Sequence, residues 1–167
     1  GFYSSEWTLE LSGVDSALGF EEPNAWLSIP SLVLPEEYSL QVWAHFPLPE
    51  TSDGHNTFFS DWNSGGAADL VQLLFHESCG LGIGDQYEQG NCGPSGMYGT
   101  GVLASDVSEG WHLITASSTP AGTTFFIDAA EVGTVSHQVS GPIVAVGNNA
   151  GGNGVAPQQA GVLSQAR

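Results

Sequence analysis

The sequence has no lysine and one arginine, Arg167, against 18 acidic residues, which gives a formal net charge of −17. So dense a negative charge repels nucleic acid and anionic lipid, and it excludes both as partners. The lack of lysine also excludes Schiff-base catalysis and lysine–asparagine crosslinks. No run approaches the roughly 18 uninterrupted apolar residues of a transmembrane helix, so we predict no membrane insertion. The acidity favours an extracellular or saline setting.

Cysteine is almost as scarce, because Cys79 and Cys92 are the only two. Glycines lie between them and would let the chain turn back. Two cysteines allow one pairing, and a disulfide closing this loop stabilises a protein by about 3 kcal/mol in an oxidising compartment. A Cys–His metal site is the competing interpretation, but neither cysteine has a partner at metal-ligand spacing. The disulfide predicts a secreted protein, extracellular or at the cell surface.

Short apolar runs, often alternating with polar residues and bounded by turn residues, dominate the rest of the chain. No long run has a helical period, so we predict an all-β protein with about a dozen short strands. A chain of 167 residues buries roughly 70% of its unfolded surface as one domain. We expect Pro30 to end a strand that begins at Trp26. The strands are expected near residues 3–11, 26–29, 38–46, 58–59, 70–75, 81–83, 97–98, 102–103, 111–116, 124–127, 132–135, 143–146 and 160–163.

The stretch from Gly110 to Asp128 reads Gly-Trp-His-Leu-Ile-Thr-Ala-Ser-Ser, a Pro-Ala-Gly turn, then Thr-Thr-Phe-Phe-Ile-Asp. It resembles the G-W-H-x-V run and the x-x-Y-V-D-G strand of the laminin-G-like, concanavalin A-like domain family. Three further blocks, at residues 9–15, 38–43 and 161–167, keep the family's order. The resemblance implies a single domain, residues 1–167, folded as a two-sheet antiparallel jelly-roll sandwich. It does not choose a function, because this fold hosts lectins, hydrolases, adhesion modules and structural subunits.

The sequence lacks the residue patterns that carry catalysis in this fold. Hydrolases of the fold use carboxylates spaced E-x-D-x-x-E on one strand, of which one protonates the leaving oxygen while another attacks or activates water. The nearest acidic pairs, residues 21–22 and 36–37, lie beside prolines, and neighbouring strand residues face opposite ways. No serine stands in a G-x-S-x-G elbow. We therefore predict that the protein is not an enzyme.

Calcium is the one cofactor that the sequence suggests. Asp61, Asn63 and Asp69 resemble the beginning of an oxygen-rich calcium loop, in which alternating Asp and Asn side chains point inward. The segment lacks the bidentate glutamate that completes such a loop, since Gln72 stands there. An Asx-type turn is the competing interpretation.

Glycan recognition pairs exposed aromatic faces with amide and carboxylate groups on loops. The residues of these kinds that we select are Trp62, Tyr87, Tyr98, Asn148 and Asn149. They predict a carbohydrate-binding site built from loops, one of which carries the disulfide. Packing of the aromatic residues over the edges of the sandwich is the alternative.

The sequence stops at Arg167, where the family commonly continues with several more strand residues. We expect the shortened strand to leave an open edge that another chain covers. The N-terminal segment alternates in polarity, and its apolar side carries Tyr3, Trp7, Leu9 and Leu11. This segment predicts strand addition between copies. The first functional hypothesis is a non-enzymatic structural subunit that assembles with copies of itself into an extracellular fibre. The alternative is a lectin-like adhesion module that binds carbohydrate with the help of calcium.

Overall fold

The computed structural model describes residues 17–20, 25–52, 54–61, 70–85, 88–92, 96–147 and 160–166. These residues form two antiparallel sheets of six strands and one turn of 3-10 helix, η1 (Ala104–Asp106). The first sheet has the order β1 (Leu18–Phe20), β12 (Gly161–Ala166), β3 (Tyr38–Phe46), β8 (Gly110–Thr119), β9 (Gly122–Ile127), β10 (Ala130–Val135). The second sheet has the order β2 (Leu27–Val33), β11 (Pro142–Val146), β4 (His55–Ser60), β5 (Leu70–His76), β6 (Gly80–Asp85), β7 (Met97–Gly99). No helix in these ranges has the length and apolar character needed to cross a membrane.

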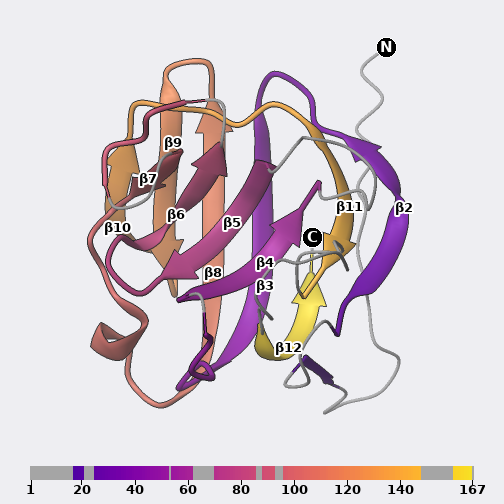
Figure 1. The fold of residues 1–167 in the computed structure, drawn as a ribbon, viewed down its shortest axis with the longest axis vertical. Helices are drawn as coiled ribbons and strands as arrows, with labels where there is room; N and C mark the ends of the chain where they lie inside the picture. The colour runs from indigo at the N-terminus through magenta and orange to yellow at the C-terminus, as the bar shows by residue number, and fades with distance from the viewer. Residues whose placement is uncertain are drawn as a thin grey trace.

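The two sheets form two layers with one core between them. In Figure 1, strands β4, β5 and β6 of the second sheet cross in front of β3, β8 and β9 of the first. Strand β3 alternates strictly, so that Val42 and Ala44 are fully buried while Trp43 between them is exposed. Phe46 at its end meets Phe75 of β5 edge to face, with ring centroids 5.5 Å apart. The inward residues of both sheets therefore build the core, and the other residues of β3 lie on an outer face.

The predicted all-β antiparallel sandwich is confirmed, but three local predictions are wrong. Strand β2 continues through Pro30 to Val33. It is an edge strand of its sheet, where proline is tolerated because its missing N–H removes no bond to a neighbour. Residues 102–103 form no strand and instead lead into η1. Strand β1 was not expected, because three residues are too few to show a period.

The closing strand β12 lies inside the first sheet and not at its edge. It pairs with β1 on one side, where Leu163 stands opposite Leu18, and with β3 on the other, where Leu163 stands opposite Ala44. Its backbone at residues 162 and 163 is therefore flanked on both sides by strands of the same chain. The expectation of an open edge at this strand is wrong for these residues. The N-terminal segment predicted to cover such an edge lies outside the described ranges.

Cys79 and Cys92 form the predicted disulfide, with their Cα atoms 5.7 Å apart. Cys79 lies in the turn between β5 and β6, and Cys92 precedes β7. Cys79 also packs with Leu74 and Met97 in a small apolar cluster of its own, against which Cys92 lies. The disulfide therefore fastens the short edge strand β7 to the body of the second sheet.

Candidate functional site

The outer face of the first sheet carries two exposed tryptophans on neighbouring strands. Trp43 of β3 is 37% exposed and Trp111 of β8 is 42% exposed. In the ladder between these strands, Trp43 stands opposite Leu113 and His45 stands opposite Trp111. The tryptophans are therefore diagonal neighbours, a relation that places Cβ atoms about 7–8 Å apart. We call Trp43, His45, Trp111 and Leu113 the aromatic platform.

The His45 ring holds one edge of the platform in place. Its centroid lies 5.3 Å from that of the Trp111 ring, and the two planes meet at 82°. An edge-to-face contact of this kind is favourable because the positive edge of one ring meets the negative face of the other. Since both residues lie on paired strands of a sheet, the platform is a flat and largely preformed surface.

Polar side chains continue this face in register with the platform. Gln41 of β3 stands opposite Thr115 of β8 in the next row. The row after that consists of hydroxyl side chains from four successive strands: Ser39, Ser117, Thr124 and Thr134. Ser39 Oγ donates a hydrogen bond to Ser117 Oγ at 3.3 Å, and the Thr124 and Thr134 hydroxyls are 3.1 Å apart. Aromatic rings at one end and hydroxyl and amide groups at the other therefore share one face.

Such a face has the chemistry to hold a sugar ring. The faces of the indole rings carry negative charge density and attract the weakly positive C–H groups of a pyranose or furanose. Hydroxyl and amide groups both donate and accept hydrogen bonds, so they suit the hydroxyl groups around the edge of a sugar.

A serine, a histidine and an aspartate come together at the end of β8. His112 Nδ1 lies 2.6 Å from Asp128 Oδ2, and His112 Nε2 lies 3.2 Å from Ser108 Oγ. The order resembles a Ser–His–Asp relay. However, Nε2 is closer to the Ser108 backbone oxygen, at 3.0 Å, and a carbonyl can only accept. A doubly protonated His112 would donate its Nδ1–H to Asp128 and its Nε2–H to that carbonyl, and in this form the ring has no lone pair with which to take the serine proton.

The same contacts explain a structural role for this group. Asp128 Oδ1 accepts a hydrogen bond from the Leu113 N–H at 2.9 Å. Partial burial, the largest single effect, raises the pKa of the Asp128 carboxyl, but the Leu113 N–H and His112 together outweigh it and hold this pKa below its usual range. Asp128 itself has a positive φ of 51° in the turn between β9 and β10. We therefore interpret His112 and Asp128 as a clamp that ties this turn to the start of β8.

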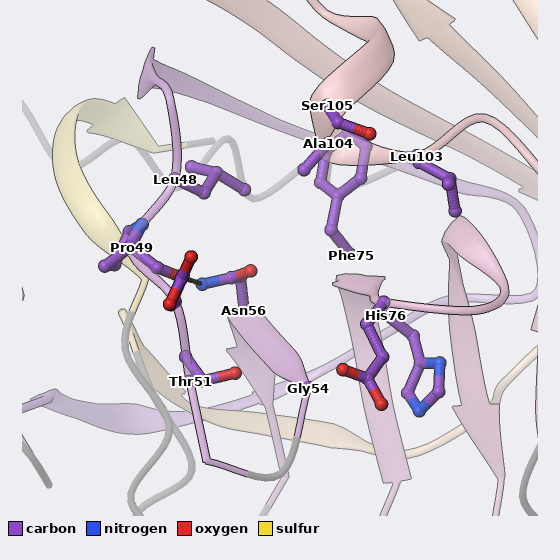
Figure 2. A pocket seen from close by; sticks show the side chains of 12 residues that line it. Leu48, Pro49, Thr51, Gly54, Asn56, Phe75, His76, Leu103, Ala104 and Ser105 are labelled. Carbon is purple, nitrogen blue, oxygen red and sulfur yellow. Dashed lines mark hydrogen bonds between the residues drawn. The ribbon is translucent and has the colours of Figure 1, made fainter.

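A cavity of 390 Å³ opens between the β3–β4 loop, the β5–β6 turn and η1 (Figure 2). Its lining includes the carboxylates of Glu50 and Glu77 and the ring of Phe75. The Asn56 side chain lies along one wall and donates a hydrogen bond to the Pro49 carbonyl at 3.0 Å (Figure 2). Phe75 is only 1% exposed, so the cavity offers no open aromatic face. The platform is for this reason the better candidate for sugar stacking.

The structure describes only a few of the residues that we selected from the sequence. Tyr98 of β7 stacks on His137, with centroids 4.1 Å apart and planes 9° from parallel, so one face of its ring is covered. His137 Nε2 in turn lies 3.0 Å from Asp85 Oδ2. Asp61 follows β4 and is buried. The selected residues outside the described ranges are Tyr3, Trp7, Leu9, Leu11, Trp62, Asn63, Asp69, Tyr87, Asn148 and Asn149.

The predicted calcium site therefore stays a prediction. Within the described ranges no three His, Cys, Asp or Glu side chains lie together in a way that would hold a metal ion. The aromatic platform, by contrast, was missed by reasoning that looked for binding residues on loops. A signal was present: Trp43 stands between Val42 and Ala44, and strand alternation alone places it outside if its neighbours are inside.

No protein-family model matches the sequence, and no curated protein matches it. Among solved structures the chain is similar to domain 4 of AbnA, a GH43 extracellular arabinanase from Geobacillus stearothermophilus, in complex with arabinotriose. That comparison has a TM-score of 0.56 and 16% identity over 85% of this chain and 65% of the other, a little under two thirds of its length. The chain is also similar to domains LG4-5 of the mouse laminin alpha1 chain, with a TM-score of 0.47 and 13% identity over 90% of this chain and 41% of the other. A third similar structure is Trypanosoma rangeli sialidase in complex with 2,3-difluorosialic acid, with a TM-score of 0.44 and 12% identity over 78% of this chain and 20% of the other.

The likeness to the arabinanase domain concerns the fold. Together with the two six-stranded antiparallel sheets, it confirms the predicted two-sheet antiparallel jelly-roll sandwich. Sequence identity this low leaves function to be argued from the residues of the site itself.

Proposed function

We propose that this protein is a non-catalytic carbohydrate-binding module that holds its glycan on the aromatic platform of the first sheet. The observation that carries the proposal is the pair of exposed indole rings of Trp43 and Trp111 on one preformed face. Large aromatic side chains that remain in contact with water at adjacent positions of a sheet are typical of a binding surface. The Gln41 and Thr115 side chains beside them supply hydrogen bonds for orientation.

The shape of the site favours a stretch of polysaccharide over a small molecule. A ligand pocket encloses most of its ligand, whereas a sheet face contacts one side only. A chain of several sugars compensates by extending over both tryptophans and onto the polar rows. The solved arabinanase domain was in complex with arabinotriose, and that precedent on the same fold supports an oligosaccharide as ligand by analogy alone.

The disulfide and the clamp fit this proposal. The Cys79–Cys92 bond is of a kind that persists outside the reducing cytoplasm, so we place the module outside the cell, where it attaches to glycan. The arrangement of His112 and Asp128 is that of a structural clamp, so we propose that chemistry on the bound glycan is not performed here.

Assembly into a fibre, the first hypothesis from the sequence, takes second place. It depends on residues 3–11, which lie outside the described ranges, and on an open edge at β12, which instead pairs with both β1 and β3 at residues 162–163. Sedimentation velocity over a hundredfold range of concentration tests it, and growth of large species would restore it. Calcium assistance through Asp61, Asn63 and Asp69 remains a separate proposal, and repeating a glycan titration with a chelator tests it.

The test of the proposed function is a glycan array followed by calorimetric titration of the best ligand. We expect Trp43→Ala and Trp111→Ala each to weaken binding by about 1–2 kcal/mol, or roughly five- to thirtyfold, because each removes one stacked ring. Trp26→Ala is the matched control. Trp26 is similarly exposed, at 40%, but it directly precedes β2 of the second sheet and is not part of the platform. Thermal unfolding of each variant checks that the fold is intact. Equal affinity of the platform variants and the wild type would refute the proposed site.

A further inference from the structure

We propose that the platform selects an uncharged glycan and rejects glycans that carry uronate or sulfate groups. This inference rests on the proposed function and names the ligand class of the same site. It follows from the charges that the chain can and cannot bring to the outer face of the first sheet.

The chain has almost no group with which to pair an anion. Proteins that bind carboxylates and sulfates use arginine or lysine, whose N–H groups form charge-assisted hydrogen bonds. Here the sequence has no lysine, and its one arginine is Arg167. Strands β3, β8, β9 and β10 therefore contain neither residue. On the platform the only side chain able to carry positive charge is His45, whose ring is packed edge-on against Trp111.

Negative charges border the same face. Glu131 of β10 pairs with Phe126 in the row that also contains Gln41 and Thr115, and it is exposed. Asp128 lies in the turn that joins β9 to β10, where its carboxylate is 2.6 Å from His112 Nδ1 and is partly compensated by that ring. Glu131 is separated from β8 by one strand and from β3 by two, so its charge reaches a ligand over the platform at low salt, where the Debye length is about 30 Å at 0.01 M, and the net charge of −17 adds a weaker repulsion.

A neutral glycan meets none of these costs. Its hydroxyl groups can donate to or accept from the hydroxyls of Ser117, Thr115 and Thr124, which do both. An anionic group on the same sugar would lose part of its hydration over the indole rings and find no cation in return. The face is therefore expected to bind a glycan that carries only hydroxyl groups more tightly than one that carries negative charge.

The experiment uses one glycan in three chemical forms. The starting material is the neutral oligosaccharide that binds best on the array. Its primary alcohols are oxidised to carboxylates, and part of that product is then methyl-esterified, which removes the charge but keeps the added carbonyl. Calorimetry in 20 mM and 500 mM sodium chloride, with each form, is expected to give about tenfold weaker binding of a tri-carboxylate at low salt. We expect the ester to recover most of the loss and high salt to recover part of it.

A variant with an added charge tests the same reasoning in the opposite direction. Thr115→Lys places an ammonium group between Gln41 and Phe126, and we expect it to strengthen binding of the oxidised form about threefold at low salt. Thr115→Gln is the matched control, because it has similar length without charge and should therefore give no such gain for the oxidised form over wild type.

The outcomes separate the inference from the proposed function. Binding of the oxidised form as tight as that of the ester, lost in Trp43→Ala, would overturn the charge selection and keep the platform as a glycan site. An array on which only acidic glycans bind through the platform would do the same. No binding of any glycan, neutral or acidic, would overturn the proposed function and the inference with it.

Discussion

Removal of the disulfide should destabilise the protein without touching the proposed binding face. The two cysteines are 13 positions apart, and closing a loop of this length in the unfolded chain accounts for about 3 kcal/mol. Their Cα separation of 5.7 Å lies in the range that a disulfide spans without backbone movement, so we expect the disulfide to contribute this amount to the free energy of unfolding. For a chain of this size the loss corresponds to a fall in Tm of roughly 6–12 °C.

The variant of choice is Cys79→Ala with Cys92→Ala, because Cys79 is 1% exposed and alanine buries no new polar group. Urea unfolding followed by tryptophan fluorescence measures the free energy, and wild type with reductant is the matched comparison. Because the disulfide anchors β7, hydrogen exchange should rise first at Met97–Gly99. Glycan affinity should not change, since the platform belongs to the other sheet. A fully reduced protein, verified by a thiol count, that unfolds at the wild-type urea midpoint would refute the reasoning.

Two further predictions concern the clamp and the tight packing of β6. Because the pKa of Asp128 lies below its ordinary 3.8, its ionised form stabilises the fold above that value, and the contribution is lost as pH falls through the lowered pKa. The urea midpoint of Asp128→Asn should therefore be below that of wild type at pH 7 and converge with it on acidification below about pH 4; a constant gap would contradict the clamp. A Cβ on Gly82 would lie 2.3 Å from the Tyr98 backbone oxygen, whereas one on Gly101 would meet nothing. Thermal unfolding should show that Gly82→Ala lowers the free energy of unfolding by about 1–3 kcal/mol, because the new Cβ overpacks the strand. Gly101→Ala should cost only about 1 kcal/mol, because its positive φ is the sole source of strain there. A larger loss for Gly101→Ala than for Gly82→Ala would be inconsistent with these contacts.

The all-β fold could be predicted because short apolar runs bounded by turn residues recur along the sequence, and such runs favour strands. Alternation of apolar and polar residues in Tyr38–Phe46 specifies a half-buried strand on its own. Gly110–Thr119 does not alternate in this way and was expected as a strand from its apolar run and the turn residues that bound it. The order of strands within a sheet is different in kind, since β3 pairs with β8 and β12 rather than with its sequence neighbours. No local pattern encodes such pairings. The resemblance to a known family implied the two-sheet architecture, and the structure supplied the pairings.

The candidate site was predictable in its chemistry but not in its place. Aromatic and amide groups were sought on loops, while Trp43 and Trp111 lie on strands. Trp43 could be assigned to an outer face from its own strand, whereas Trp111 stands in a run that does not alternate. The proximity of the two tryptophans could not be predicted from either strand, because it requires the register that puts His45 opposite Trp111. Likewise, no sequence signal indicated that His137 covers one face of Tyr98.

The position of β12 has a consequence for how the protein matures during synthesis. Leu18–Phe20 and Tyr38–Phe46, made early, must wait for Gly161–Ala166 before the gap between them is filled. Contacts this distant along the chain slow folding, because the entropy cost of closing a long loop precedes the formation of any stabilising contact. Ser164 stands opposite Trp43, so β12, which is synthesised after the other strands of both sheets, also completes one side of the aromatic platform. A chain truncated before residue 161 would therefore have a gap between β1 and β3 and an unfinished platform.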